Sequence, residues 1–215
     1  MPSLTRSYSS KDYTEINKTL KYVISYYAVI GIPYCVGIFF AAPEIIYIIG
    51  GSEYLAATGS LMILSFSLLF TLAGEMFIGN IILLPSGRES YFLKSCIITT
   101  IADIVGNYFL IPIWGINGAA FATTLAGILN LLILSIAVEK DIQFEGVINV
   151  FRSPIIGSLF IPIVIFICRK TIDHILFRSF VSIVLCVVLY LIVITAMRNE
   201  LVIDIIRSIK AKIKK

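Results

Sequence analysis

The chain has 215 residues and a formal net charge of +4, from 17 lysines and arginines against 13 aspartates and glutamates. Apolar residues make up 59% and charged residues 14%, and the mean hydropathy is +0.98. Soluble domains have about 45–50% apolar and about 25% charged residues, so this composition excludes an ordinary soluble protein. It also excludes a disordered chain, because such chains are poor in apolar residues. The sequence therefore predicts a membrane protein, and we expect no nucleic-acid partner.

Six stretches are apolar enough to cross a bilayer as helices, which takes about 20 residues each. They cover residues 22–42, 56–84, 90–111, 116–138, 150–168 and 179–197. Short turns with proline and glycine, 85–88 and 112–115, separate the second, third and fourth stretches, so these three should pack as antiparallel neighbours. Residues 43–51 are too few to cross, and we expect an outer re-entrant or interfacial helix there. The fold class is thus an all-α integral membrane protein built as a six-helix transmembrane bundle.

Lysine and arginine are unevenly distributed between the two sides of this bundle. With the N-terminus in the cytoplasm, only Arg169, Lys170 and Arg178 lie outside, and the positive-inside rule then predicts that both termini are cytoplasmic. Residues 1–21 should form a cytoplasmic interfacial helix opened by a capping box at Asp12 and Glu15. Residues 22–197 form the bundle. Residues 198–215 are a basic tail that is either an amphipathic helix on the membrane surface or a simple topology signal.

Polar residues recur inside the third stretch at every fourth position. They are Ser95, Thr99, Asp103 and Asn107. An ionised aspartate near the centre of a bilayer costs about 2.5–3.5 kcal/mol, so Asp103 must be paired, protonated or hydrated. Two interpretations stay open: the stripe lines a wet transport cavity and takes part in ion coupling, or Asp103 makes a helix–helix hydrogen bond, for example to Asn130.

The second stretch repeats this spacing with Ser67, Thr71 and Glu75. Glu75 either lines the same cavity or is an interfacial or ion-paired carboxylate. Arg88 and Lys94 near that end could bind a diphosphate as charged donors. The alternative is that their positive side chains only reach back to the membrane interface. The candidate transport-cavity residues are Ser67, Thr71, Glu75, Arg88, Lys94, Thr99, Asp103, Asn107 and Asn130.

Sequence motifs for catalysis or for cofactors are missing. The chain has no nucleotide-binding loop, HExxH or GxSxG, and its single histidine, His174, falls in a predicted outer loop. The four cysteines lie in apolar runs without a CxxC pair and are expected to pack as small hydrophobes. We therefore predict a non-enzyme without cofactor or metal. Pro33 and Pro162 should kink their helices, and the small residues from Gly115 to Ala126 should let helices approach closely.

Several segments resemble one known family. They are 30–33 (Ile-Gly-Ile-Pro), 37–46, 50–54 (Gly-Gly-Ser-Glu-Tyr) and 107–123, which contains Leu-Ile-Pro and Gly-Ile-Asn-Gly-Ala-Ala. Together they are similar to the polysaccharide (O-antigen type) flippases of the multidrug/oligosaccharidyl-lipid/polysaccharide exporter superfamily. Residues 2–6 resemble the cytoplasmic linker between the two halves of that family. The resemblance covers about residues 1–140, and Asp103 departs from it, standing where the family has an amide.

This resemblance implies the C-terminal half of a MATE-like two-bundle transporter. Such a flippase would move polyprenyl-diphosphate-linked oligosaccharides across the bacterial cytoplasmic membrane by alternating access, for O-antigen, capsule or exopolysaccharide synthesis. The implied partners are this substrate, membrane lipids and an N-terminal six-helix bundle, with polysaccharide polymerase and glycosyltransferases as further candidates. Two alternatives stay open. One is a cation-coupled multidrug exporter of the same superfamily, and the other is a membrane-embedded acyl- or glycosyltransferase using Glu44, Glu53 or His174.

Overall fold

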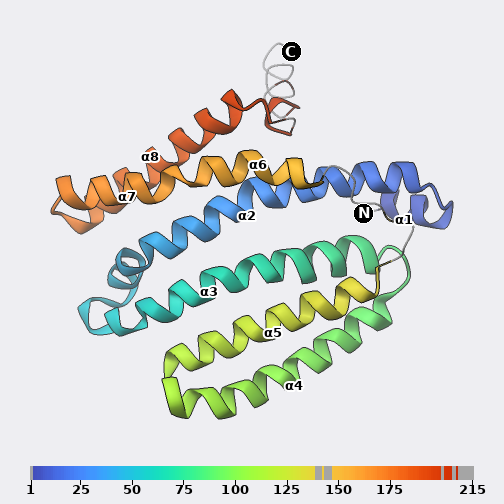
Figure 1. Ribbon diagram of the computed structural model, residues 1–215, viewed down its shortest axis with the longest axis horizontal. Helices are drawn as coiled ribbons and strands as arrows, with labels where there is room; N and C mark the ends of the chain where they lie inside the picture. The colour runs from blue at the N-terminus through green and yellow to red at the C-terminus, as the bar shows by residue number, and fades with distance from the viewer. Residues whose placement is uncertain (1, 139–141, 143–146, 200, 205–206, 208–215) are drawn as a thin grey trace.

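The computed structural model describes residues 2–138, 142, 147–199, 201–204 and 207 (Figure 1). The described elements are all helical. In chain order they are α1 (Pro2–Ser9), α2 (Tyr13–Gly50), the 3₁₀-helix η1 (Ser52–Ala57), α3 (Thr58–Thr71), the π-helix η2 (Leu72–Leu83), α4 (Glu89–Trp114), α5 (Ile116–Ile136), α6 (Val147–Ser158), α7 (Phe160–Thr171) and α8 (Ile175–Ala196). Six of the described helical stretches are long and apolar enough to cross a membrane, which confirms the predicted fold class.

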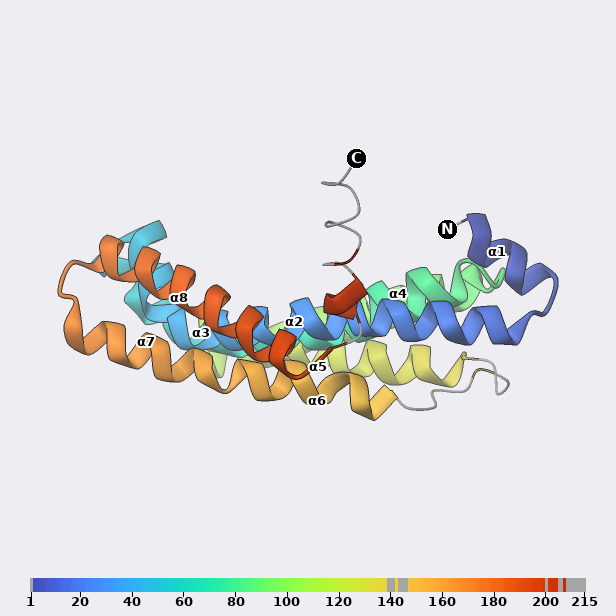
Figure 2. The ribbon, with the colours of Figure 1, turned by 90° about the horizontal axis from the view of Figure 1, so that it is seen from above.

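The helices form a flattened bundle made of two groups (Figures 1 and 2). One group contains α2, the α6–α7 pair and α8, and the other contains α3–η2, α4 and α5. The two groups meet where α2 packs against α3. The second group is the antiparallel hairpin series that the short turns predict. Its α4–α5 turn passes through Gly115, which has a φ of 56°, a conformation that favours glycine.

Helix α2 runs without interruption through both of its prolines and ends at Gly50. The separate re-entrant helix predicted for residues 43–51 is therefore wrong: this segment is the last part of α2. The predicted cap at Asp12 is confirmed, because the Glu15 amide donates to Asp12 Oδ1 at 3.1 Å. The helix that it opens is α2 itself and not a short separate helix, so residues 13–21 continue directly into the first span.

The fifth predicted span is made of two helices in the structure. Helix α6 ends at Ser158 and α7 begins at Phe160, but Leu159 between them keeps helical dihedral angles, so Ile148–Thr171 is still one span. Proline has no amide hydrogen for the carbonyl four residues earlier, which here is that of Ser158. The interruption between α6 and α7 therefore lies next to the position at which the sequence predicts a kink.

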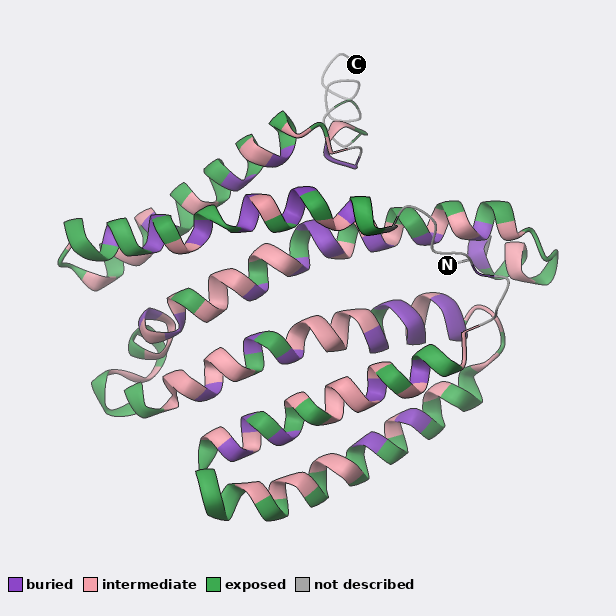
Figure 3. Ribbon diagram, in the orientation of Figure 1, coloured by how far each residue is buried: buried purple, intermediate pink, exposed green. Residues whose placement is uncertain are grey.

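Burial is concentrated at the end of the bundle that holds the N-terminus (Figure 3). The largest apolar cluster joins α1, α2, η2 and α5, and its most buried members are Ile16, Leu20, Ile82, Leu83 and Leu134. Large apolar side chains on α4 and α8 are exposed instead, for example Ile104 at 64% and Phe180 at 68%. Outward apolar faces of this kind suit contact with lipid or with further helices.

Small residues bring α4 and α5 into close contact, as predicted. A Cβ atom on Gly118 would collide with the carbonyl oxygen of Leu110, and one on Gly106 would lie 3.1 Å from Cβ of Ala122. Two of the cysteines, Cys35 and Cys168, are buried and the other two are half-buried. Most of the predicted amphipathic tail, from Ile205 onward with the exception of Arg207, lies outside the described residues.

Candidate functional site

Three polar side chains from three helices form one hydrogen-bonded cluster inside the second group. Asn130 of α5 stands in the middle and is 4% exposed. Its Nδ2 donates to Glu75 Oε1 of η2 at 3.3 Å, and its Oδ1 accepts from the Ser95 hydroxyl of α4. Buried polar groups are retained at low cost only when they are paired in this way. This Glu75–Asn130–Ser95 cluster ties η2, α5 and α4 together.

The π-helix η2 places Glu75 in this cluster. In a π-helix each turn is widened to i→i+5 hydrogen bonds, so residues five positions apart lie above one another, and such segments are frequent at functional sites. The Leu84 amide shows this widened turn, since it donates to the Gly79 carbonyl at 3.0 Å, and Asn80 Nδ2 also donates to the Glu75 carbonyl at 3.0 Å. Gly74 allows η2 to lie against α5, because a Cβ there would be 3.3 Å from the Leu131 Cα. The close approach brings the Glu75 carboxylate within reach of Asn130.

The polar stripe of α4 faces the bundle, and two of its members bond within their own helix. The Thr99 hydroxyl donates to the Ser95 carbonyl at 2.9 Å, and Asn107 Nδ2 donates to the Asp103 carbonyl at 2.9 Å. Among the described residues, Asn130 finds its side-chain partners in Ser95 and Glu75. The helix–helix hydrogen bond considered for Asp103 is thus made by Ser95 instead.

Asp103 is the stripe residue whose side chain the bundle leaves incompletely satisfied. Its Oδ1 is buried and has no hydrogen-bond partner among the described residues. A carboxylate oxygen out of contact with water is costly unless a proton, a cation or a donor reaches it. Within the described bundle, no donor fills this position beside Asp103 Oδ1.

Ser67 and Thr71 lie on the same span as Glu75, but among the described residues the cluster's hydrogen bonds are those of Glu75, Asn130 and Ser95. Ser67 is buried against Gly127 of α5, where an added Cβ would lie 3.6 Å from the Ser67 hydroxyl oxygen. Thr71 is half-buried at the end of α3. The helix changes from α to π after Thr71, and both Ser67 and Glu75 lie against α5, at Gly127 and at Asn130 respectively.

Arg88 and Lys94 are placed apart from one another. Arg88 Nη1 donates to the Ala137 carbonyl at 2.9 Å, at the C-terminal end of α5, where a positive charge stabilises the helix dipole. Lys94 is exposed, with its Nζ 5.9 Å from the centre of the Tyr91 ring. The proposed binding of a diphosphate by this pair stays a prediction.

A buried ion-pair cluster, which the sequence analysis missed, joins the far ends of α2, α7 and α8. Glu44 is 6% exposed. Arg169 binds it with two bonds, Nε to Oε1 at 2.6 Å and Nη2 to Oε2 at 2.7 Å, and Arg178 Nη2 adds a third at 3.2 Å. In the sequence, the only signal for this cluster was an acidic residue on the same predicted side of the membrane as two cations.

The transferase alternative would use Glu44 or His174, and the structure gives both side chains structural contacts. Glu44 pairs with the two arginines, and His174 caps α8 by accepting from the Phe177 amide.

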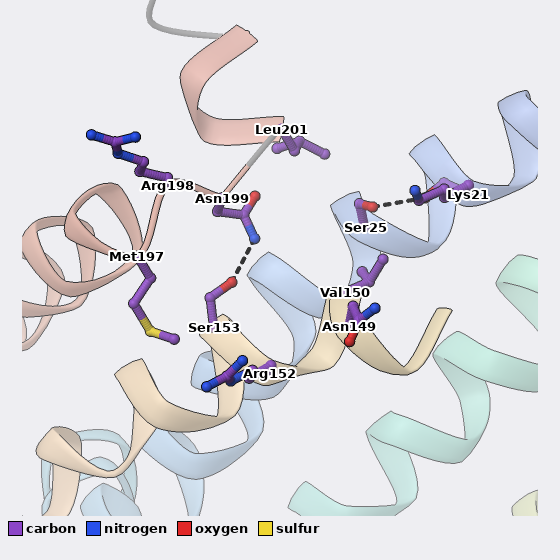
Figure 4. Close-up of a pocket in the computed structure, with 10 residues that line it drawn as sticks. All are labelled: Lys21, Ser25, Asn149, Val150, Arg152, Ser153, Met197, Arg198, Asn199 and Leu201. Carbon is purple, nitrogen blue, oxygen red and sulfur yellow. Dashed lines mark hydrogen bonds between the residues drawn. The ribbon is translucent and has the colours of Figure 1, made fainter. Parts of the chain in front are cut away.

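A second missed feature is a basic cavity of about 500 Å³ between α2, α6 and the end of α8 (Figure 4). Lys21, Arg152 and Arg198 line it together with the amides Asn149 and Asn199, and none of the described lining residues is acidic. Asn199 Nδ2 donates to the Ser153 hydroxyl at 2.6 Å and thereby joins the end of α8 to α6. Among the described residues, no group of three His, Cys, Asp or Glu side chains could hold a metal ion.

The six apolar helical stretches define the chain as a multi-pass α-helical membrane protein, with a fold consistent with half of a transporter. A family model described as the lipid II flippase MurJ matches residues 1–166. The chain belongs to this family. It is a family of flippases and not of enzymes, so the resemblance to lipid-linked flippases is confirmed, whereas the match does not extend to the O-antigen type specifically.

A solved structure supports the same fold. The chain superposes on "Lipid II flippase MurJ, inward closed conformation" with a TM-score of 0.72 and 20% sequence identity, over 93% of this chain and 42% of that one. The chain therefore spans less than half the length of the flippase it matches. No curated protein matches the chain significantly.

Proposed function

We propose that this chain is one six-helix half of a flippase that moves a polyprenyl-diphosphate-linked saccharide across the bacterial cytoplasmic membrane. The observation that carries the proposal is the family match over residues 1–166, in a chain whose bundle contains the Glu75–Asn130–Ser95 cluster and the unpartnered Asp103 oxygen. The family's name favours lipid II, the peptidoglycan precursor, as the cargo. The saccharide units of O-antigen and other surface polysaccharides share its diphosphate chemistry and are the second candidate.

The polar residues would serve a transported headgroup and not a chemical reaction. Sugar hydroxyls and a diphosphate crossing hydrocarbon need donors, acceptors and a hydrated path. We assign Thr99, Asp103 and Asn107 to the wall of such a path, with Asp103 as the residue that exchanges a proton or a cation. Arg88 and Lys94 would contact the diphosphate at its entrance. In the proposed topology both termini are cytoplasmic, with residues 1–21 as the linker, 22–197 as the bundle and 198–215 as the tail.

Alternating access in transporters of this kind needs two repeats that rock about a central site. The chain covers 42% of the solved flippase it matches, which fits one repeat. We therefore infer that a second six-helix bundle completes the passage and that this chain by itself does not transport.

Vesicles that contain the full chain, with and without the bundle that completes it, test this function. Fluorescent lipid II, a polyprenyl-diphosphate O-antigen unit and a cationic dye are the three cargoes, and a membrane-impermeant quencher reports which of them crosses. We expect flipping of a polyprenyl-diphosphate cargo only when both bundles are present. Transport of the dye alone would replace the flippase by a multidrug exporter, and flipping by the isolated chain would disprove the two-bundle requirement.

A further inference from the structure

We propose that α2 has a hinge at Pro33 and that α8 keeps this hinge straight by binding α2 on both sides of it. Loss of the hydrogen bond from Tyr190, on one side of the hinge, would let the part of α2 from Pro33 to Gly50 move against the rest of the bundle. This assigns a conformational device to the chain, which goes beyond the proposed transport and does not depend on the nature of the cargo.

Pro33 makes this part of α2 easy to bend. A proline inside a helix has no amide hydrogen for the carbonyl four residues earlier, and sharp kinks in helices are mostly found at proline. Here that carbonyl belongs to Val29, yet α2 continues through Pro33 to Gly50. In transmembrane helices a neighbouring helix commonly supplies the missing donor. For Val29 the donor is the Tyr190 hydroxyl of α8, at 2.6 Å.

The span beside α2 has its own interruption at this depth. Gly157 of α6 lies against the Tyr190 ring, since an added Cβ there would be 2.9 Å from ring carbons. Helix α6 ends one residue later, and α7 begins at Phe160. Tyr190 thus lies between Val29 of α2 and the end of α6. Both spans therefore have a point of reduced stiffness close to the same side chain.

Helix α8 is the unbroken helix beside these two spans, and it contains neither proline nor glycine. Tyr190 binds α2 before Pro33. Arg178 binds it beyond Pro33, because its Nη2 donates to Glu44 Oε1 at 3.2 Å. At a rise of about 1.5 Å per residue, the two attachment points are about 18 Å apart on α8 and about 22 Å apart on α2. These lengths are similar, so α8 can lie along the hinge with both of its attachments made.

Between the two attachment points, a cavity of about 490 Å³ separates α2 from α8. Pro33 and Gly37 line it from α2, and Ser182 lines it from α8. A Cβ atom on Gly37 would meet nothing within 4 Å. Because side chains do not fill this space, the connection of α8 to α2 depends on the Tyr190 hydrogen bond and on the Glu44 ion pair.

Bending at Pro33 would change how the two groups of helices meet. Among the described residues, those of α2 in and around the largest apolar cluster run from Tyr13 to Ile32, so the cluster holds α2 only up to the hinge. The two groups meet where α2 packs against α3. A kink of about 20° at Pro33 would move Ile49, about 24 Å further along the helix, sideways by roughly 8 Å.

Distances between spin labels on the full chain in lipid nanodiscs test the hinge. The four native cysteines are replaced by alanine, and the labels are attached at Ile49→Cys on α2 and Ile113→Cys on α4, two positions that are 80% and 70% exposed. We expect Tyr190→Phe to shift or broaden the distance distribution by up to roughly 8 Å. The control Tyr108→Phe, which removes an exposed hydroxyl, should keep the distribution of the unmodified chain.

The variant Pro33→Ala separates a hinge from a general loosening of the bundle. It restores an amide hydrogen at position 33, so the Val29 carbonyl regains a donor within its own helix and no longer needs Tyr190. We therefore expect Pro33→Ala/Tyr190→Phe to keep the distribution of the unmodified chain. A shift that persists in this double variant would mean that Tyr190 acts through packing, and the hinge would be disproved. Identical distributions in Tyr190→Phe and Tyr108→Phe would disprove it as well.

The other attachment of α8 is tested without changing Tyr190. Arg178→Gln releases α8 from Glu44, which keeps its two bonds to Arg169 of α7. We expect the same labels to report a shift in this variant, and Pro33→Ala should reverse it. Lys170→Gln removes an exposed charge next to Arg169 and is the control. If Arg178→Gln and Lys170→Gln give the same distribution, α8 does not bridge the hinge and the proposal is wrong.

Discussion

The phenol of Tyr190 in α8 donates a hydrogen bond of 2.6 Å to the carbonyl oxygen of Val29 in α2. Val29 is four residues before Pro33, which has no amide hydrogen to offer that carbonyl. The hydroxyl therefore takes the place of the missing intrahelical donor. Tyr190 is 7% exposed, and its ring packs against Gly157 of α6, where an added Cβ would lie 2.9 Å from ring carbons. One side chain thus joins α8, α2 and α6.

Replacing this phenol by phenylalanine should destabilise the chain. Tyr190→Phe keeps the ring on Gly157 but leaves the Val29 carbonyl buried without a donor, which costs about 1–3 kcal/mol. Thermal unfolding in detergent, followed by circular dichroism, measures the effect. Tyr108→Phe removes a hydroxyl from a side chain that is 76% exposed and should leave the unfolding temperature unchanged. An equal shift in both variants would contradict the role assigned to Tyr190.

The Glu44 ion-pair cluster should stabilise the other end of α2 and α8 against unfolding, as the Tyr190 hydrogen bond does at its own position. Glu44→Gln removes the charge that faces both Arg169 and Arg178, and the loss of one partner from a buried pair costs about 3–5 kcal/mol. Because the Arg169 side chain is 35% exposed, water will reduce this, and we expect a loss of about 2 kcal/mol in the free energy of unfolding. Glu53→Gln is the control, since Glu53 is exposed. A Glu44→Gln chain as stable as the control would show that the ion pairs contribute nothing net.

The Glu75–Asn130–Ser95 cluster predicts energetic coupling between helices. Single and double alanine variants of Ser95 and Asn130 form a double-mutant cycle, and residues in one hydrogen-bonded network differ from additivity by about 0.5–3 kcal/mol. The pair Asn107 and Asn130 is the control cycle, because the Asn107 side chain bonds to the carbonyl of Asp103 in its own helix. Unfolding free energies in detergent give both cycles. Additivity for Ser95 and Asn130 would mean that their hydrogen bond is not formed in the membrane protein.

The number of membrane-spanning stretches and the all-helical class could be predicted from the sequence, because the thickness of the hydrocarbon fixes how many apolar residues a span needs. What escaped prediction depends on partners far along the chain. Along α2, Tyr190 supplies a donor to the Val29 carbonyl that Pro33 leaves without one, and Arg169 donates to the Phe40 carbonyl, three residues before Pro43. Those donors come from α8 and α7, and no local pattern reveals them.

For the polar residues too, the spacing along the sequence predicts which face turns inward, but not which side chains form hydrogen bonds with one another. A four-residue spacing on α4 predicted which face turns inward, but not that Ser95 would meet Asn130. On the second span the spacing did not reveal that the π-helix η2 begins after Thr71. Helical propensities do not identify π-helices, since these depend on the packing that surrounds them.

Removing the Asp103 carboxylate should affect stability and transport in opposite directions. Asp103→Ala removes a buried carboxylate oxygen that has no partner among the described residues, so expression and thermal stability should be kept or slightly raised. Transport by a complete flippase that contains this chain should fall, because the group that exchanges a proton or a cation is gone. Asp103→Asn keeps the shape of the side chain without its charge, and its transport should fall equally if the charge is what matters.

Quencher-based flipping in vesicles measures transport by both variants. Cysteines placed at Thr99, Asp103 and Asn107 report access of water to this face by their reaction with a membrane-impermeant thiol reagent. Full transport by Asp103→Ala, together with three unreactive cysteines, would make this face of α4 a packing surface and remove it from the transport path.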